Sequence, residues 1–128
     1  MEDRYLFKAK HFEEWHIGNI VKEPDRLYIR DIKENVMAYI DDESTICQCT
    51  GLKDKNGKLI WENDVVGFWD TYSTENGQAE MDCIGKVVWD DETISFQVTN
   101  RLSAESYEVL DECCVIGNIF DNPELIHE

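Results

Sequence analysis

The sequence predicts a mainly β protein, built as a small sandwich or barrel. Apolar and polar residues alternate in many short segments, which is the period of a half-buried strand. These segments recur about every ten residues with turn-forming residues between them, as in small β sandwiches and barrels. No segment carries the period of a long amphipathic helix. An α+β fold with one or two short helices is the alternative, because two late segments carry helix-start signals.

The expected strands follow from this alternation and from the turn residues between them. Most of them contain β-branched or aromatic side chains, which favour extended backbone. In chain order they are Tyr5 to Ala9, Trp15 to Ile20, Leu27 to Ile29, Val36 to Ile40, Ile46 to Thr50, the two arms around Asn56-Gly57, Val65 to Trp69, Ile84 to Trp89, Ile94 to Val98 and Val115 to Phe120.

The clearest hairpin lies around Asn56-Gly57. This pair supplies two residues that tolerate positive φ, so it predicts a type I′ turn, with Leu52 on one arm and Leu59 to Trp61 on the other. Asn63 follows closely, and asparagine also tolerates positive φ, so a second tight turn is expected there.

A later hairpin turns at Asp90 to Thr93. Val87 and Trp89 share one strand face before this turn, so we expect Trp89 to lie in the core. The run Val65 to Trp69 is apolar except at Gly67, which predicts burial on both faces or an exposed aromatic patch.

Three segments depart from the strand pattern. Asp70 to Asp82 is polar and acidic, which predicts a long surface loop over residues 70–82. Leu102 to Leu110 is expected to form one or two helical turns capped by Ser103. Asn122-Pro123 places a capping residue before a proline, which predicts a terminal helical turn.

Charge is the dominant compositional feature. The chain has 128 residues, and 12 basic residues against 28 acidic ones give a net charge of −16. Such a charge opposes binding to nucleic acid, because that affinity comes largely from lysine and arginine at the phosphates. It favours fast encounter with a basic partner. Lys53, Lys55 and Lys58 form a basic patch too small to reverse this expectation.

The chain length predicts one domain over residues 1–128, in which an N-terminal sub-region 1–45 could precede a barrel over 46–128. No apolar run is long enough to cross a bilayer, and Met1 to Arg4 lack a signal-peptide pattern, so we expect a cytoplasmic protein that does not bind membranes. Five cysteines are an odd number, and reduced, mostly buried thiols are the expectation.

No residue pattern predicts catalysis, a cofactor or a metal. Cys47, Cys49 and the Cys113-Cys114 pair lack zinc-finger spacing, and His11, His16 and His127 show no ligand pattern. His16 is expected to point outward from a strand. Acidic clusters at Asp41 to Glu43, Asp90 to Glu92 and Asp111-Glu112 sit at predicted turns, where solvated charge is the ordinary explanation.

Five blocks of the sequence together resemble a known family. They are Leu6 to Lys10 (LFKAK), Trp15 to Ile20 (WHIGNI), Glu43 to Ile46 (ESTI), Gln48 to Lys58 (QCTGLKDKNGK) and Val115 to Leu125 (VIGNIFDNPEL). In order and spacing they are similar to the YopX family of phage and prophage proteins. Asn63 departs from the glycine that the family usually has before the aspartate.

The resemblance implies a small barrel of the Src-homology-3 type with extra N-terminal strands, a bacterial host cell, and self-association in some members. It implies no established activity. We therefore expect a phage or prophage accessory protein that is not an enzyme and that acts as a protein-interaction or self-assembling module. Its partner would be a protein with basic character or a second copy of the chain. The alternative is an acidic mimic of DNA that inhibits a host nucleic-acid-binding protein. The expected partner surface comprises Asp41, Asp42, Trp69, Tyr72, Asp90, Asp91 and Glu92.

Overall fold

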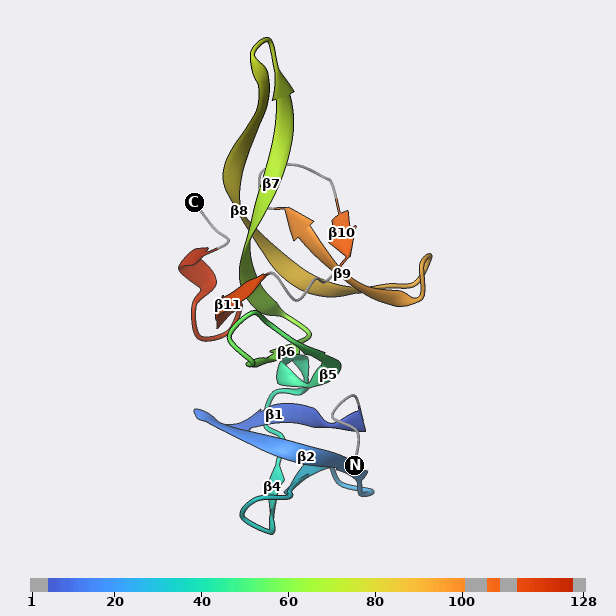
Figure 1. Ribbon diagram of the computed structural model, residues 1–128. Helices are drawn as coiled ribbons and strands as arrows, with labels where there is room; N and C mark the ends of the chain where they lie inside the picture. The colour runs from blue at the N-terminus through green and yellow to red at the C-terminus, as the bar shows by residue number, and fades with distance from the viewer. Residues whose placement is uncertain (1–4, 101–105, 109–112, 126–128) are drawn as a thin grey trace. The chain divides into compact units, whose positions relative to one another are not determined.

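The computed structural model describes residues 5–100, 106–108 and 113–125, and it is mainly β (Figure 1). The described residues form two antiparallel sheets and two short 3₁₀ turns, with no α-helix. The chain divides into two compact units, residues 1–51 and residues 52–128, here called unit 1 and unit 2.

Unit 1 is an antiparallel sheet whose strands are hydrogen bonded in the order β4-β3-β2-β1-β5. The last strand continues past residue 51 into unit 2, where β6 lies beside it. The elements are β1 (Phe7–His11), β2 (Glu14–Lys22), β3 (Leu27–Asp31), β4 (Val36–Tyr39), the 3₁₀ turn η2 (Glu43–Thr45), β5 (Cys47–Lys53) and β6 (Leu59–Trp61).

The core of unit 1 lies on one face of this sheet. Ala9, Ile29 and Ile40 are buried, and Ile20 packs against them. Ile29 is the cross-strand partner of Ile20 and of Ala38, so alternation along three strands brings apolar side chains together.

Unit 2 is an antiparallel sheet in the order β10-β9-β8-β7-β11. Ile60, Val66, Val87, Val98 and Cys113 form its buried cluster. The elements are β7 (Asp64–Thr74), β8 (Gly77–Asp90), β9 (Ser95–Asn100), β10 (Ser106–Glu108), β11 (Cys114–Asn118) and the 3₁₀ turn η3 (Pro123–Leu125). The predicted terminal helical turn is therefore present as a single 3₁₀ turn.

The predicted surface loop over residues 70–82 is wrong, because β7 and β8 continue through it. Ten residue pairs join the two strands, from Val65 with Lys86 to Thr74 with Gly77. Figure 1 shows this hairpin extending beyond the neighbouring strands of its sheet. Backbone hydrogen bonds can hold two antiparallel strands together even where the side chains show no apolar alternation. The polar composition of the segment therefore gave no sign of the hairpin. Gly77, at φ 118°, supplies its turn.

Two further expectations about secondary structure need correction. In the segment from Leu102 to Leu110, the described residues Ser106–Glu108 form β10 rather than a helical turn, and the rest, including Ser103, lies outside the described residues. The expected Src-homology-3 barrel is not confirmed. A sheet closes into a barrel when its two end strands pair with each other. In the described residues the end strands of each sheet, β4 and β6 in one and β10 and β11 in the other, have one neighbour each.

The turns differ in how well the sequence predicted them. Gly57 has φ 81° but Asn56 is not at positive φ, so the type I′ prediction is wrong. The Gly57 N–H donates a hydrogen bond of 3.0 Å to Asp54 O. Gly57 therefore closes a hairpin loop of the longer, bulged type. Asn63, at φ 69°, does form the expected tight turn.

Trp89 is 43% exposed, so the predicted core position is wrong. It shares the face of the buried Val87, but it lies next to the β8–β9 turn, beyond the core. There its ring stacks edge-on against Phe96 at a centroid distance of 5.0 Å. The five cysteines do follow expectation, since none forms a disulfide and four are buried.

Candidate functional site

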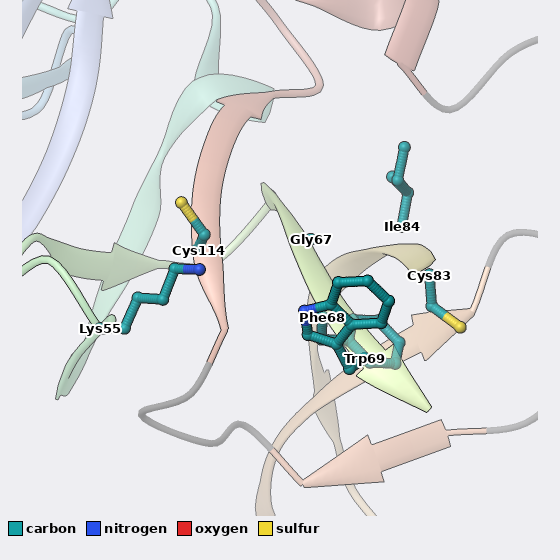
Figure 2. Close-up of a pocket in the computed structure, with 7 residues that line it drawn as sticks. All are labelled: Lys55, Gly67, Phe68, Trp69, Cys83, Ile84 and Cys114. Atoms are coloured by element: carbon teal, nitrogen blue, oxygen red, sulfur yellow. The ribbon is translucent and has the colours of Figure 1, made fainter. Parts of the chain in front are cut away.

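The candidate site is a pocket of about 290 Å³ in unit 2, formed along β7, β8 and β11. Figure 2 shows the residues around it. Trp69 is 62% exposed and stands beside the pocket, so its indole is available to a partner. The lining residues are Lys55, Gly67, Phe68, Trp69, Cys83, Ile84 and Cys114.

Strand register explains why these residues meet. On β7, Gly67 pairs with Ile84 of β8 on one side and with Cys114 of β11 on the other. Phe68 pairs with Cys83 and also packs against the core. Because Gly67 has no side chain, the floor of the pocket stays open. A Cβ placed there would lie 3.9 Å from Cys83 O, which is ordinary contact without a clash.

The wall formed by Lys55 and Cys114 is held by the buried carboxylate of Asp54. Its Oδ1 accepts the backbone N–H groups of Asn56 and Lys58, each over 2.9 Å. Its Oδ2 accepts the N–H of Val115 on β11, also over 2.9 Å. One side chain thus ties the β5–β6 hairpin to β11.

Two further hydrogen bonds support the same wall. The Lys55 N–H donates to Cys113 O at a distance of 3.0 Å, and the Asn56 side-chain amide donates to Cys114 Sγ at a distance of 3.3 Å. Burial alone would raise the pKa of Asp54, but the N–H groups of Val115, Lys58 and Asn56 outweigh it and lower that pKa below the ordinary aspartate value. Asp54 is therefore ionised at neutral pH, which strengthens all three bonds.

Residues 11–127 match the family described as YopX protein. The chain belongs to the YopX family. No curated protein matches the sequence significantly. YopX membership confirms the resemblance seen in the sequence and assigns no activity. No helix in the described residues is long and apolar enough to cross a membrane.

The structure places the sequence-predicted site residues of this YopX protein in different surroundings. Trp69 lines the pocket, whereas none of the five acids does. Tyr72 belongs to β7, but its side chain is outside the described part. The acids Asp41, Asp42, Asp90, Asp91 and Glu92 lie at or beside turns. Asp42, Asp90 and Asp91 each accept a local hydrogen bond through the side chain, and Asp41 accepts one from the N–H of Phe12, 29 positions away.

Several residues of the pocket were missed by sequence reasoning. Lys55, the Cys83-Ile84 pair and Cys114 are separated by long stretches of chain and meet through the strand pairing of β7, β8 and β11 and the hydrogen bond from Lys55 N–H to Cys113 O. The alternation of β8 could have placed Ile84 on a defined face, but nothing local signals its contact with Gly67.

A second group of polar residues was also missed, and it lies in unit 1. His16, expected to point outward, is only 7% exposed. Its Nδ1 lies 2.9 Å from Asp31 Oδ2, and Glu34 lies near both. These are the residues of the described chain that are grouped closely enough to hold a metal ion.

Proposed function

We propose that this YopX protein is a non-catalytic interaction module, and that the pocket beside Trp69 docks a protein partner. The observation that carries the proposal is the exposed indole of Trp69 at the edge of a preformed pocket. Exposed tryptophans next to pockets are frequent anchors of protein interfaces, because they bury a large apolar area with little loss of side-chain entropy.

The pocket's chemistry indicates what the partner inserts. Ile84 and Trp69 lie on the same sheet face as Gly67 and give the pocket apolar walls, and Lys55 adds one cation to its lining. An apolar or aromatic side chain fits these walls. A basic side chain in the pocket would be repelled by the positive charge of Lys55, so we expect the partner's basic residues to lie outside the pocket.

The distribution of charge supports a partner with basic character. Unit 1 has seven basic and eleven acidic residues, a net of −4. Unit 2 has five basic and seventeen acidic residues, a net of −12. The field is therefore strongest in the unit that carries the pocket. It should speed encounter with a basic protein and weaken at high salt.

The proposal is tested by affinity capture from bacterial lysate with the full chain and two tryptophan variants. Trp69→Ala removes the pocket-side indole, and Trp89→Ala removes another exposed indole of unit 2 outside the pocket. We expect a captured protein to be lost with Trp69→Ala, retained with Trp89→Ala and released by salt near 1 M, where the Debye length is about 3 Å. Equal capture by both variants would contradict the proposal.

Neutralising the acidic turns tests the electrostatic part separately. The variant changes the five acids of the expected partner surface, Asp41, Asp42, Asp90, Asp91 and Glu92, to Asn or Gln. Capture should weaken at low salt and differ little from wild type at high salt. Capture that ignores both salt and these substitutions would show that the partner is not recruited by charge.

Self-association is a second candidate, and the edge strand β4 favours it. Val36 and Met37 on β4 are 45% and 49% exposed, and β4 has one neighbour in the described sheet. Exposed apolar edge strands pair readily with another copy. Sedimentation analysis over a range of concentrations tests this, with Met37→Lys expected to shift any dimer toward monomer.

Mimicry of DNA is a third candidate, favoured by the net charge of −12 in unit 2. A mimic competes with DNA for a nucleic-acid-binding host protein, so captured proteins should be displaced by duplex DNA. Displacement by DNA together with indifference to Trp69→Ala would favour mimicry over pocket docking.

A further inference from the structure

His16, Asp31 and Glu34 form a compact polar cluster on unit 1, unrelated to the pocket. His16 lies on β2, Asp31 ends β3 and Glu34 follows in the β3–β4 turn. One donor atom from each side chain lies within 4.8 Å of the other two. His16 and Asp31 are buried, at 7% and 6% exposure, while Glu34 is exposed. The cluster is therefore shielded from solvent at His16 and Asp31 and open to solvent at Glu34.

Local structure builds this arrangement. Gly18 on β2 is the cross-strand partner of Asp31, and a Cβ at Gly18 would clash with the backbone carbonyl oxygen of Arg30. The missing side chain allows close approach of the strands and leaves room for Asp31 to reach His16, two residues along β2. Asp31 Oδ1 also accepts the N–H groups of Lys33 and Glu34, each over 2.9 Å, which turns the chain so that Glu34 returns to the cluster.

The cluster is rich in negative charge. The N–H of Glu34 above all, and then His16, lower the pKa of Asp31 below the ordinary aspartate value, so this carboxylate is ionised at neutral pH. Glu14 Oε2 adds a carboxylate 4.0 Å from His16 Nε2, too far for a hydrogen bond. In the described residues, no lysine or arginine forms an ion pair with Glu14, Asp31 or Glu34.

His16 lies beside these carboxylates, and its imidazole can carry positive charge. The carboxylates of Asp31, Glu34 and Glu14 gather beside one imidazole, and a divalent cation is a common source of compensation for such negative charge. His16 supplies a buried imidazole nitrogen, which is a ligand for transition metals, whereas calcium and magnesium prefer oxygen.

We propose that His16, Asp31 and Glu34 bind a divalent transition-metal ion of the Zn²⁺ type. His16 Nδ1 and Asp31 Oδ2 lie 2.9 Å apart as hydrogen-bond partners, so a small separation of the two side chains would let both atoms bind one ion. In the metal-free protein, Nδ1–H donates to the ionised Asp31. When the ion binds, Nδ1 gives its lone pair to the metal, and the ring proton resides on Nε2, on the side of Glu14.

The roles of the carboxylates follow from their positions. Asp31 and Glu34 supply oxygen ligands, and water completes the coordination on the side open to solvent. Glu14 moves closer than the observed 4.0 Å and becomes an outer carboxylate that accepts a hydrogen bond from Nε2–H, an arrangement common around metal-bound histidines. The site ties β2 to the β3–β4 turn, which suggests a structural ion that stabilises unit 1.

The test measures Zn²⁺ binding to the reduced full-length protein by isothermal titration calorimetry. Glu34→Gln is the decisive variant, because Glu34 is exposed and its loss should not prevent folding. Glu13→Gln is the matched control, since it removes the same charge from an exposed residue outside the cluster. We expect one Zn²⁺ per chain, affinity at least about tenfold weaker in Glu34→Gln, and unchanged affinity in Glu13→Gln.

Two spectroscopic measurements distinguish this site from adventitious binding to cysteines. Zn²⁺ should move the ¹⁵N resonance of His16 Nδ1 in the labelled protein, and Co²⁺ should give visible absorption without intense thiolate charge-transfer bands. The proposal is overturned by absence of binding, by equal affinity of the wild type and Glu34→Gln, by an unmoved His16 resonance, or by a thiolate spectrum.

Discussion

Replacing Asp54 with alanine should loosen the wall of the candidate pocket and lower the stability of unit 2. The substitution removes the acceptor of three backbone N–H groups, those of Asn56, Lys58 and Val115, each at 2.9 Å. A hydrogen bond to a charged group contributes about 1.5–3 kcal/mol. Asn56 and Lys58 are exposed, so water replaces the carboxylate there at little loss. Val115 is half-buried, so water reaches its N–H less easily and the loss of the Asp54 acceptor costs more there.

Together these contributions give an expected loss of about 2–4 kcal/mol in the free energy of unfolding. Urea denaturation followed by tryptophan fluorescence measures it, with a lower midpoint and an unchanged slope as the signature of lost stability. Asp91→Ala is the control, because Asp91 is exposed and accepts one hydrogen bond, from Trp89 Nε1. Its loss should be below about 1 kcal/mol. If Asp54→Ala is no more destabilising than this control, the carboxylate does not hold the pocket wall.

Other predictions concern the turn, pH, nucleic acid and the pocket. Gly57→Val should destabilise the protein by about 1–3 kcal/mol through strain at φ 81°; an unchanged urea midpoint would show that this φ is not maintained in solution. Because the folded-state pKa values of Asp31 and Asp54 are lowered, their contribution to stability is present above about pH 4 and is lost as pH falls through the folded-state values. Asp54→Asn should therefore reduce the slope of stability against pH on the acid side, and an identical slope would be inconsistent with this linkage. The protein should not bind mixed-sequence DNA at physiological salt, and submicromolar, salt-sensitive binding by fluorescence anisotropy would contradict this. Trp69→Ala should leave the urea midpoint nearly unchanged, since Trp69 is 62% exposed; a large drop would show a structural role instead.

The strands were largely predictable because burial on one face imposes a period of two. Ala9 and Ile29 show this, since both lie on expected strands and are fully buried. The turn at Asn63 was predictable for another local reason, because asparagine tolerates the positive φ found there.

Where burial does not decide the structure, the same reasoning failed. The β7–β8 hairpin is held along its outer part by a backbone ladder, so polar residues were misinterpreted as a loop. Trp89 follows the alternation of Val87 correctly but lies past the end of the core. A local pattern gives the face on which a residue lies, not how far the core extends along it.

The polar contacts of both candidate sites were beyond local reasoning. Asp54 and Val115 are 61 positions apart, and His16 and Asp31 are 15 apart. In the sequence both aspartates occupy positions that are typical of turns. The sequence alone therefore could not distinguish a role in the local turn from a long-range hydrogen bond. Strand order and register had to be known before either contact could be inferred.

Site-specific photocrosslinking tests pocket docking most directly. A photoreactive amino acid is placed at Ile84, which lines the pocket, or at Ile94, which is 75% exposed and outside it. We predict that the probe at Ile84 crosslinks a host protein in bacterial lysate, that added Trp69→Ala substitution removes this product, and that the probe at Ile94 does not form it. The same product from both positions, or a product from Ile84 that persists without Trp69, would contradict the proposed docking site.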